Sequence, residues 1–234
     1  MLNRKITLDE VDSTNNYLKL KRGELPDGTL VTARIQTAGK GRRGHEWLAD
    51  QGMLPLSLLL KQPPHPDTLT LCAGVAVCEA LEPLLPGEDL GIKWPNDIIL
   101  RGHKLCGILC ESVCFGSSMD IVCGIGVNLA QTAKFFEKAN IPHGGSVEML
   151  TGVTINDRDK LAEDIAERLY SYSRSGFESV REKYVKRCLT VGKKIRIIEN
   201  GSEREAFAEG IAPNGFLVCS DENGRFEVNS GEVS

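Results

Sequence analysis

The sequence predicts an α+β protein in two parts, on the basis of three observations. Up to residue 188, segments with the two-residue alternation of strands are interspersed with segments that have the apolar spacing of helices. Beyond residue 188, short strand-like segments are separated by Asn-Gly turns, which predicts a small β-barrel. The 234 residues correspond to about one and a half domains of roughly 150 residues. We therefore expect a larger domain over residues 1–188 and a smaller one over 189–234.

The first third of the sequence is expected to contain three strands and two helices. Polar and apolar residues alternate in the first strand, the second is rich in β-branched residues, and the third is almost entirely apolar. Ser13 and its neighbours are typical helix N-cap residues, and Gly23 favours a helix end. The expected strands are residues 5–8, 29–35 and 54–60, and the expected helices begin after Asp12 and span 69–80.

The remainder is expected to continue with strands, then helices, then strands again. Strands are expected at 91–94, 97–100, 104–113 and 120–127, helices at 161–169 and 177–184, and C-terminal strands at 191–198, 205–211, 215–219 and 225–228. Asn200-Gly201 and Asn214-Gly215 are strong hairpin signals. The change in pattern near residue 188 is the basis for the expected domain boundary.

The composition argues against several classes of function. Thirty-two acidic and 28 basic residues give a net charge of −4, whereas proteins whose main role is non-specific nucleic-acid binding are usually basic. The longest apolar run, 54–60, is far shorter than the ~20 residues of a transmembrane helix, and the N-terminus lacks a signal-peptide core. We therefore expect a cytoplasmic protein that does not associate with membranes.

The eight cysteines do not have the spacing of a metal site. No pair forms Cys-x-x-Cys, and the four histidines do not cluster with them. Free cysteine behaves as a small buried hydrophobic residue. We expect ordinary buried thiols and no zinc site.

A basic, glycine-rich segment at 36–47 is the most unusual part of the sequence. Four bases and one acid between Arg34 and Trp47 give a local charge of +3. Glycines allow backbone N–H groups to approach an anion, arginines bind phosphate through two donors, and the indole of Trp47 could stack on a base. The segment lacks the Walker pattern, so it is not a P-loop. The alternative is a solvated, flexible basic loop.

The second motif, Lys93-Trp94-Pro95-Asn96-Asp97, places several polar groups at the end of a strand. Proline restricts the preceding residue to an extended conformation, and Asn-Asp after it favours a turn. A tryptophan is rarely used in a surface turn. The motif therefore indicates either a binding site or a β-turn with a structural tryptophan.

A third feature is Lys104, which opens a strand whose other residues are apolar. In a partly enclosed site its ammonium group would be a strong point charge for a carboxylate or phosphate. The alternative is that Lys104 is the exposed start of a strand.

The fourth motif, Gly124-Ile125-Gly126-Val127-Asn128, has two glycines within a strand. Such glycines indicate close approach by a ligand or another backbone, although a packing role is also possible. The Asn128 amide offers the donor and acceptor needed to bind an adenine edge.

Together, in this order and at this spacing, the motifs resemble those of the biotin protein ligase (biotin–[carboxylase] ligase) family. The resemblance runs from Asp12 to Ser234. Its carriers are Ser13-Thr14-Asn15, Gln36, Gly39-Lys40-Gly41-Arg42-Arg43-Gly44, Trp47, 93–97, 104–109 and 124–128.

The resemblance implies a fold and a two-step reaction. The fold would be a mixed-sheet catalytic domain related to the class II aminoacyl-tRNA synthetase-like ligases, followed by a small β-barrel. The biotin carboxylate would attack the α-phosphate of Mg-ATP, giving biotinyl-5′-AMP and pyrophosphate. A specific lysine of a biotin carboxyl carrier domain would then attack the mixed anhydride, giving the amide and AMP.

The resemblance also implies roles for individual residues. Lys104 and Arg42 would be catalytic, with Arg42 at the acyl-phosphate and Lys104 at the biotin carboxyl oxygen. Ser13, Thr14 and Gln36 would bind the neutral ureido ring through hydrogen bonds, which suits hydroxyls and amides. The full expected biotin-binding set is Ser13, Thr14, Asn15, Gln36, Lys40, Gly41, Arg42 and Lys104. The expected ATP-binding set is Arg43, Trp47, which would pack on adenine, Lys93, Asn96 and Asn128, with Asp97 as the candidate ligand of Mg²⁺.

The basic segment is also expected to close over the acyl adenylate, because a free adenylate is prone to hydrolysis and water must be excluded. We expect residues 36–47 to be mobile without ligand.

Two positions depart from the family: Lys40 stands where arginine is common, and Pro55 stands where an aromatic residue is frequent. Since proline cannot donate to a central ladder, the edge of the biotin pocket could differ.

Three other functions would each fit part of this pattern. A lipoate or octanoate ligase shares the adenylate chemistry and a related fold, but the basic segment and Lys93–Asp97 favour biotin. A DNA-binding repressor of the same family would need an N-terminal helix-turn-helix domain. The motif Ser13-Thr14-Asn15 begins after only a dozen residues. We therefore expect a monofunctional ligase without DNA binding. A non-catalytic nucleic-acid module would explain neither Lys104 nor Asn128. A monomer and a homodimer both remain open.

Overall fold

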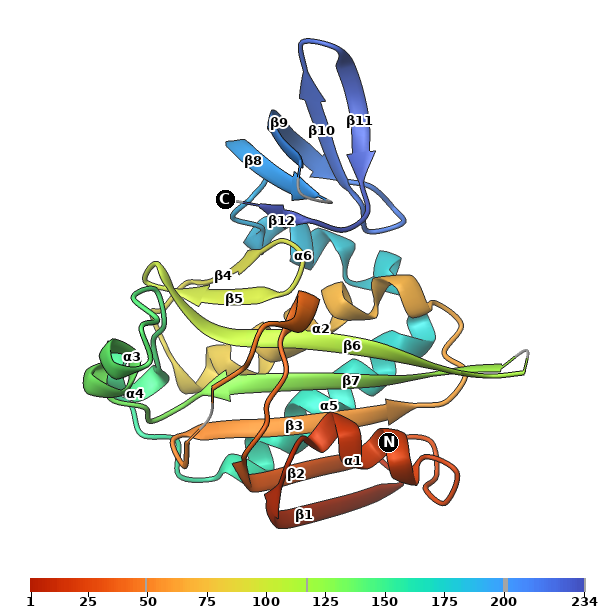
Figure 1. Cartoon of the computed structure of the whole chain (residues 1–234), viewed down its shortest axis with the longest axis vertical. Helices are drawn as coiled ribbons and strands as arrows, with labels where there is room; N and C mark the ends of the chain where they lie inside the picture. Colours follow the sequence, from red (N-terminus) through yellow and green to blue (C-terminus); the bar gives the residue numbers. More distant parts are fainter. Residues whose placement is uncertain (49, 117, 200–201, 234) are drawn as a thin grey trace.

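The computed structural model describes the whole chain except residues 49, 117, 200–201 and 234, and its strands form two sheets (Figure 1). The larger sheet has the strand order β1-β2-β3-β7-β6-β5-β4. Its strands are β1 (Arg4–Val11), β2 (Thr29–Gln36), β3 (Met53–Leu60), β4 (Leu90–Lys93), β5 (Asp97–Leu100), β6 (His103–Phe115) and β7 (Ser118–Asn128). Strands β1 and β2 pair in parallel and the other neighbours are antiparallel, so the predicted α+β class with a mixed sheet is confirmed.

Six α-helices lie in the described part of the chain. They are α1 (Thr14–Lys21), α2 (Leu69–Leu81), α3 (Ala133–Lys138), α4 (Val147–Thr151), α5 (Arg158–Ser175) and α6 (Arg181–Arg187). Ser13 caps α1 as predicted, since its side chain accepts the N–H of Asn16. Helices α3 and α4 were not predicted, because helices of six and five residues are too short to show an apolar periodicity.

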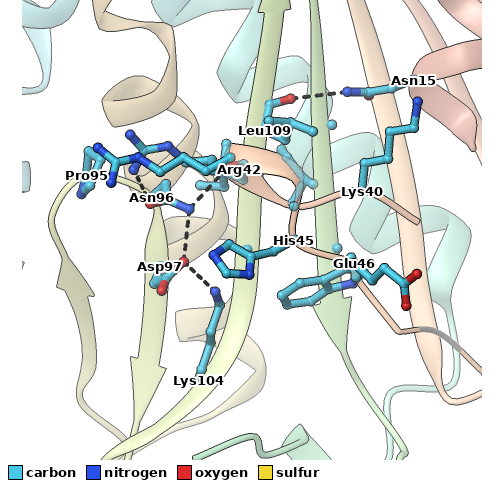
Figure 2. A pocket seen from close by; sticks show the side chains of 18 of the residues that line it. Asn15, Lys40, Arg42, His45, Glu46, Pro95, Asn96, Asp97, Lys104 and Leu109 are labelled. Atoms are coloured by element: carbon cyan, nitrogen blue, oxygen red, sulfur yellow. Dashed lines mark hydrogen bonds and ion pairs between the residues drawn. The ribbon is translucent and has the colours of Figure 1, made fainter. Parts of the chain in front are cut away.

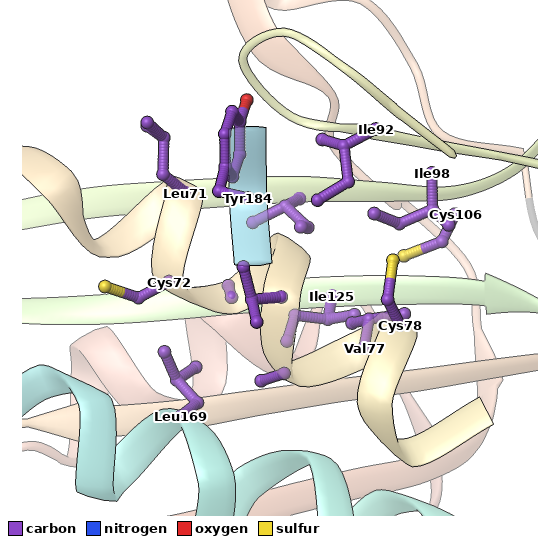
Figure 3. Close-up of a cluster of buried hydrophobic side chains, with 14 of the residues drawn as sticks. Leu71, Cys72, Val77, Cys78, Ile92, Ile98, Cys106, Ile125, Leu169 and Tyr184 are labelled. Atoms are coloured by element: carbon purple, nitrogen blue, oxygen red, sulfur yellow. The ribbon is translucent and has the colours of Figure 1, made fainter. Parts of the chain in front are cut away.

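Helices cover both faces of the larger sheet, which explains why β3 is buried along its whole length. Leu54, Leu56, Leu58 and Leu60 belong to the main core. The same core contains Val77 of α2 and Leu169 of α5 (Figure 3). Leu59 points the other way and packs with Leu18 of α1. The main core therefore lies between the sheet and helices α2 and α5, and α1 covers part of the opposite face.

Pro55 lies in β3 at the point where the ladder with β2 ends and the ladder with β7 continues. The pairing of β3 with β2 ends at Leu56, one residue short of the proline. On the other side Pro55 is aligned with Gly126 of β7. The proline is tolerated in a central strand because it falls just beyond the stretch that β2 pairs.

The second sheet is antiparallel, with the order β11-β10-β9-β8-β12. Its strands are β8 (Lys194–Glu199), β9 (Ser202–Ile211), β10 (Leu217–Asp221), β11 (Gly224–Val228) and β12 (Glu232–Val233). The first four were predicted and β12 was not. The expected Asn200-Gly201 turn lies outside the described residues. Within the described residues no ladder joins β11 to β12, so closure into a barrel stays a prediction.

Trp94 connects the two sheets. Its backbone N–H donates to the Thr190 hydroxyl at 3.0 Å, and its indole Nε1 donates to the Gly215 carbonyl at 3.1 Å. The side chain is buried, and the peptide bond to Pro95 is cis. Apolar residues of both sheets belong to one continuous core.

All eight cysteines are free in the structure. The prediction of buried thiols is confirmed for Cys72, Cys78, Cys106, Cys123 and Cys219 and is wrong for Cys114, which is exposed near the tip of the β6–β7 hairpin. Within the described residues, no helix combines the length and the apolar character that a membrane crossing requires.

Candidate active site

A cavity of about 340 Å³ opens on the α1 face of the larger sheet (Figure 2). The structure brings thirteen of the predicted site residues to its wall. They are Ser13, Thr14, Asn15, Gln36, Lys40, Gly41, Arg42, Arg43, Trp47, Lys93, Asn96, Asp97 and Lys104. Segments far apart in the sequence therefore meet around one space.

The basic segment 36–47 folds over the cavity through its own backbone hydrogen bonds. Gly41 N–H donates to the His45 carbonyl at 2.7 Å, and Trp47 N–H donates to the Gly39 carbonyl at 3.0 Å. The indole of Trp47 then lies against Gly107 of β6 and Gly126 of β7, where an added Cβ would approach the ring to 2.7 and 2.5 Å. The predicted close approach at Gly126 of β7 is thus made by a side chain of this loop.

One end of the cavity is built from neutral hydroxyls and amides. The Thr14 N–H donates to Gln36 Oε1 at 3.0 Å, and the Thr14 hydroxyl lies 2.7 Å from that of Ser57. The amide of Asn15 lies against Gly124, where a Cβ would come within 2.4 Å of Oδ1. Such a group of neutral donors and acceptors suits an uncharged polar ring.

The other end carries charge, arranged as a chain of four side chains (Figure 2). Lys104 Nζ lies 2.8 Å from Asp97 Oδ1, which also accepts from the Asn96 amide at 3.0 Å. Arg42 Nη1 donates to Asn96 Oδ1 at 3.0 Å. The ammonium of Lys104 is also 5.2 Å from the centre of the Trp47 ring. Two cations therefore face the same part of the cavity, where an anionic ligand would be attracted.

A β-bulge aims Lys104 into the cavity. Ile98 of β5 is aligned with Cys106 and its neighbour Ile99 with Lys104, so Leu105 is an extra residue in β6. Leu105 and Cys106 are both buried in the main core. Without the bulge, alternation would place Lys104 on the same face as Cys106 and away from the cavity.

The basic segment also touches the second sheet. Arg43 Nη1 donates to the Ile198 carbonyl at 3.1 Å, and Ile198, Gly231 and Val233 contribute to the cavity wall. At the opposite edge Lys40 Nζ lies 3.4 Å from Asn16 Oδ1 of α1. The C-terminal sheet therefore completes the wall, which was not predicted from the sequence.

Asn128 is the one predicted site residue that the structure does not bring to the cavity wall. Its side chain is buried, its Nδ2 donates to the Lys104 carbonyl at 3.4 Å, and its Oδ1 accepts from Gln131 Nε2 at 3.0 Å. In this state Asn128 holds the start of β6 in place.

Four residues that were not predicted from the sequence shape the site. Ser57 and Glu111 hold the amide of Asn15, Gly107 makes room for Trp47, and Gln131 holds Asn128. Gly107 stands in a strand, where glycine is a signal of close approach. The others carry no local signal, because their importance comes from partners distant in the sequence.

The cysteine below the site is chemically inert. Burial raises the pKa of Cys106 well above its ordinary value, with the Asp97 carboxylate adding to the effect. A thiol that stays protonated is a poor nucleophile, so Cys106 is not a candidate nucleophile of the site.

No group of three or more His, Cys, Asp or Glu side chains gathers to hold a metal in the described part of the chain. Mg²⁺ that arrives with a nucleotide needs only one or two protein carboxylates in addition to the phosphates. Asp97 supplies one carboxylate at the cationic end, so this donor set fits a metal carried by a substrate.

Comparison with known proteins identifies the family. A family model described as the biotin/lipoate A/B protein ligase family matches residues 8–128, more than half of the chain. The chain belongs to this family. It is 35% identical over 239 residues to the biotin–[acetyl-CoA-carboxylase] ligase of Paracoccus denitrificans, covering 97% of this chain and 98% of the relative. It is also 32% identical over 219 residues to the ligase of the same name from Mycobacterium tuberculosis, covering 88% and 79% of the two chains.

A solved structure shows that the resemblance extends to the whole fold. The biotin protein ligase from Aquifex aeolicus, in complex with biotin and ATP, superposes with a TM-score of 0.82 and 29% sequence identity. The superposition covers 100% of this chain and 98% of that chain. Both sheets of this family member therefore have counterparts in that ligase.

Proposed function

We propose that this protein is an ATP-dependent ligase that attaches biotin to one lysine of a biotin carboxyl carrier domain, through biotinyl-5′-AMP. The observation that supports this most strongly is the polarity of the cavity. Thr14 and Gln36 form a neutral polar end, whereas Arg42 and Lys104 form a cationic end. Biotin has the same polarity, with a neutral urea ring at one end and a carboxylate at the other.

In the first step a carboxylate oxygen of biotin attacks the α-phosphorus of Mg-ATP, and the bond to the pyrophosphate oxygen breaks. Both reactants are anions, so positive charge must offset their repulsion. Lys104 binds the carboxylate, and Arg42 contacts the developing acyl-phosphate. The biotin-binding group comprises Ser13, Thr14, Asn15, Gln36, Lys40, Gly41, Arg42 and Lys104.

The nucleotide occupies the part of the cavity under the basic segment. Trp47 packs on the adenine, and Arg43, Lys93 and Asn96 surround the phosphates and ribose. Asn128 reads the adenine edge only if its amide turns from Lys104 toward the cavity. Asp97 is the candidate ligand of the Mg²⁺ that accompanies ATP.

In the second step the neutral amine of the carrier lysine attacks the acyl carbon. The bond between that carbon and the phosphate oxygen breaks, AMP leaves, and the amine loses a proton as the amide forms. The partner is therefore the carrier domain of a biotin-dependent carboxylase. Its lysine must reach the acyl carbon at the cationic end.

The neutral end of the cavity also distinguishes biotin from lipoate, the other acyl substrate of the family. Lipoate has a dithiolane ring without N–H or carbonyl groups, which would leave the polar groups around Thr14 and Gln36 without partners. Unpaired buried polar groups cost binding energy. The hydroxyls and amides of this end therefore favour biotin.

We further infer two domains, a catalytic one over residues 1–188, of the class II aminoacyl-tRNA synthetase-like type, and a smaller one over 189–234. The contact of Arg43 with Ile198 supports a role for the smaller domain in closing the site. Eight free thiols are typical of proteins from a reducing compartment, and the cytoplasm stays our prediction.

The test is incubation of the protein with biotin, Mg-ATP and a biotin carboxyl carrier domain, followed by mass spectrometry of the carrier. We expect the mass of one biotinyl group on one lysine. A parallel ATP–pyrophosphate exchange assay compares biotin with lipoate. Exchange with lipoate and none with biotin would replace this proposal with the lipoate alternative.

A further inference from the structure

A row of hydrogen-bonded side chains leads from an ion pair near the surface to the neutral end of the cavity. Lys19 Nζ of α1 lies 2.7 Å from Glu111 Oε1 of β6. The other carboxylate oxygen, Oε2, accepts from Asn15 Nδ2 at 2.8 Å. Asn15 Oδ1 lies 2.6 Å from Ser57 Oγ, which in turn lies 2.7 Å from Thr14 Oγ1. Neither Lys19 nor Glu111 lines the cavity, so any effect they have on a ligand passes through the other three.

The chemistry of its neighbours fixes the orientation of the Asn15 amide. Nδ2 faces the Glu111 carboxylate and the Leu109 carbonyl, at 2.8 and 3.2 Å, and both groups only accept hydrogen bonds. Oδ1 must therefore face Ser57 Oγ, at 2.6 Å. These two acceptors together prevent the amide from turning over, and the Glu111 carboxylate makes the shorter of the two contacts.

The orientation of Asn15 determines the direction of the next two bonds. Ser57 has one hydroxyl hydrogen, and Asn15 Oδ1 cannot donate, so Ser57 donates to Asn15. Because Ser57 gives its hydrogen to Asn15, the 2.7 Å contact between the two hydroxyls takes its hydrogen from Thr14, in preference to the longer 3.2 Å contact of Thr14 Oγ1 with Gln36 Oε1. Thr14 Oγ1 therefore offers a lone pair, and no hydrogen, to a ligand.

Gln36 has the opposite character. Its Oε1 accepts the backbone N–H of Thr14 at 3.0 Å, and a backbone N–H can only donate. Its Nε2 must therefore lie on the other side of the amide, close to Gly39. An acceptor at Thr14 thus stands beside a donor at Gln36.

We propose that the Lys19–Glu111 ion pair, acting through Asn15 and Ser57, fixes this polarity, so that the cavity binds a ligand N–H at Thr14 and a ligand carbonyl at Gln36. Glu111 and Ser57 are positioning residues for the recognition of a cyclic urea. The inference rests on the proposed function, because it names the chemical basis on which biotin is selected.

The substitution Glu111→Gln tests the proposal, because it keeps the shape and replaces one acceptor oxygen with a donor. With its remaining oxygen bound to Lys19, the new amide would present N–H groups to Asn15 Nδ2, and only the Leu109 carbonyl at 3.2 Å would still favour the present orientation of the Asn15 amide. In the turned-over orientation the hydrogen-bond directions at Ser57 and Thr14 reverse, and the Thr14 hydrogen is released toward Gln36 Oε1 and the ligand. We expect the biotin dissociation constant, measured by titration calorimetry, to rise about tenfold or more, the factor for one lost hydrogen bond.

Three further measurements separate this role from a structural one. KM for ATP and kcat in pyrophosphate exchange should change less than about twofold. The affinity for desthiobiotin, which keeps the urea, should fall by the same factor as the affinity for biotin. Glu79→Gln is the matched control, since Glu79 also pairs with a lysine, Lys183, at 2.7 Å but lies outside the cavity wall. Its biotin affinity should be unchanged.

A double-mutant cycle with Ser57→Ala gives the decisive result. If Glu111 acts through Ser57, the double variant loses no more biotin affinity than the more impaired single variant. Additive losses, a biotin affinity of Glu111→Gln equal to that of the wild type, or an equal loss in the ATP KM would each overturn the inference. These outcomes leave the proposed function intact, whereas a wild-type protein that binds no biotin would overturn both.

Discussion

Trp47 of the basic segment lies directly on Gly126 of β7, with its Nε1 2.5 Å from the position that a Cβ of residue 126 would take. Gly126 is aligned with Gly107 of β6, which lies against the six-membered ring of the same indole. The two glycines together form a flat floor for the ring. The position of the basic segment over the cavity therefore depends on the absence of side chains at Gly107 and Gly126 in neighbouring strands.

Substituting Gly126→Ala should impair closure of the basic segment. Its methyl group would meet the indole at a distance that real Cβ atoms do not adopt, and over-packing of this kind costs about 1–3 kcal/mol. We expect the rate of adenylate formation, measured by pyrophosphate exchange, to fall by roughly 5- to 150-fold, as that cost implies.

Gly210→Ala provides the control for the loss of a strand glycine. Gly210 lies in β9, and an added Cβ there would have nothing within 4 Å, so this variant should keep the wild-type rate. Equal rates for Gly126→Ala and the wild type would show that Trp47 need not rest on the sheet.

Lys104→Ala should impair the first chemical step. The ammonium is the cation that the bulge in β6 aims into the cavity, and its removal takes away stabilisation of charge that develops on the carboxylate and phosphate. We expect a loss of about 2–4 kcal/mol in transition-state stabilisation, roughly 30- to 1000-fold in pyrophosphate exchange. Lys93→Ala, at the same wall, serves as a comparison. A first-step rate equal to that of the wild type would exclude Lys104 from the chemistry.

The position of Lys104 also shows where sequence reasoning stops. The sequence predicts that the residue opens a strand, which is correct, because alternation and apolar content are local properties. The direction of its side chain depends on the bulge at Leu105, which is set by the pairing of β6 with β5. No local pattern in residues 103–107 signals that extra residue.

The residues of the cavity wall also divide into those that the sequence could identify and those that it could not. The basic residues of the segment 36–47 could be identified because its composition is unusual, and they all meet the cavity. Ser57 could not, since it is one serine in an apolar strand, and its value comes from facing Thr14 and Asn15 of α1. Asn128 was expected at the wall and is instead turned toward the Lys104 carbonyl, because Gln131 holds its amide from behind.

The basic segment offers a test of gating by proteolysis. Lys40, Arg42 and Arg43 are trypsin sites, and the side chains of Lys40 and Arg43 donate hydrogen bonds to Asn16 and to the Ile198 carbonyl. A loop that orders over the adenylate becomes a poor protease substrate. We expect cleavage within residues 36–47 to slow at least about tenfold when biotin and ATP are present.

Cleavage at other trypsin sites in the same sample provides the reference rate. Biotin with an ATP analogue whose α–β phosphate bond cannot be cleaved should protect less than the pair that forms the adenylate. Equal cleavage of the segment with and without ligands would contradict closure.

Stability at low pH should depend on Glu79, which ties three helices together. Its carboxylate lies 2.7 Å from Lys183 of α6 and 3.5 Å from Arg168 of α5, and it accepts a hydrogen bond from Tyr172. Burial opposes ionisation of Glu79, but the bonds from Lys183 and Tyr172 outweigh it, so its pKa lies below its ordinary value of 4.5. A carboxylate whose pKa is lowered by folding stabilises the folded state most above its unfolded pKa.

The stabilisation by Glu79 should therefore be complete at pH 7 and disappear as the pH falls from about 4.5 through the lower pKa of the folded state. We expect Glu79→Gln to lower the free energy of unfolding by about 1.5–3 kcal/mol at pH 7, the range for hydrogen bonds to charged groups. In urea denaturation series between pH 7 and pH 3, the difference from the wild type should shrink toward the acidic end. Glu24→Gln, which breaks only the exposed pair with Lys21, should cost less than about 0.5 kcal/mol throughout. A difference for Glu79→Gln that stays constant down to pH 3 would mean that packing of the side chain, rather than its charge, holds the three helices together.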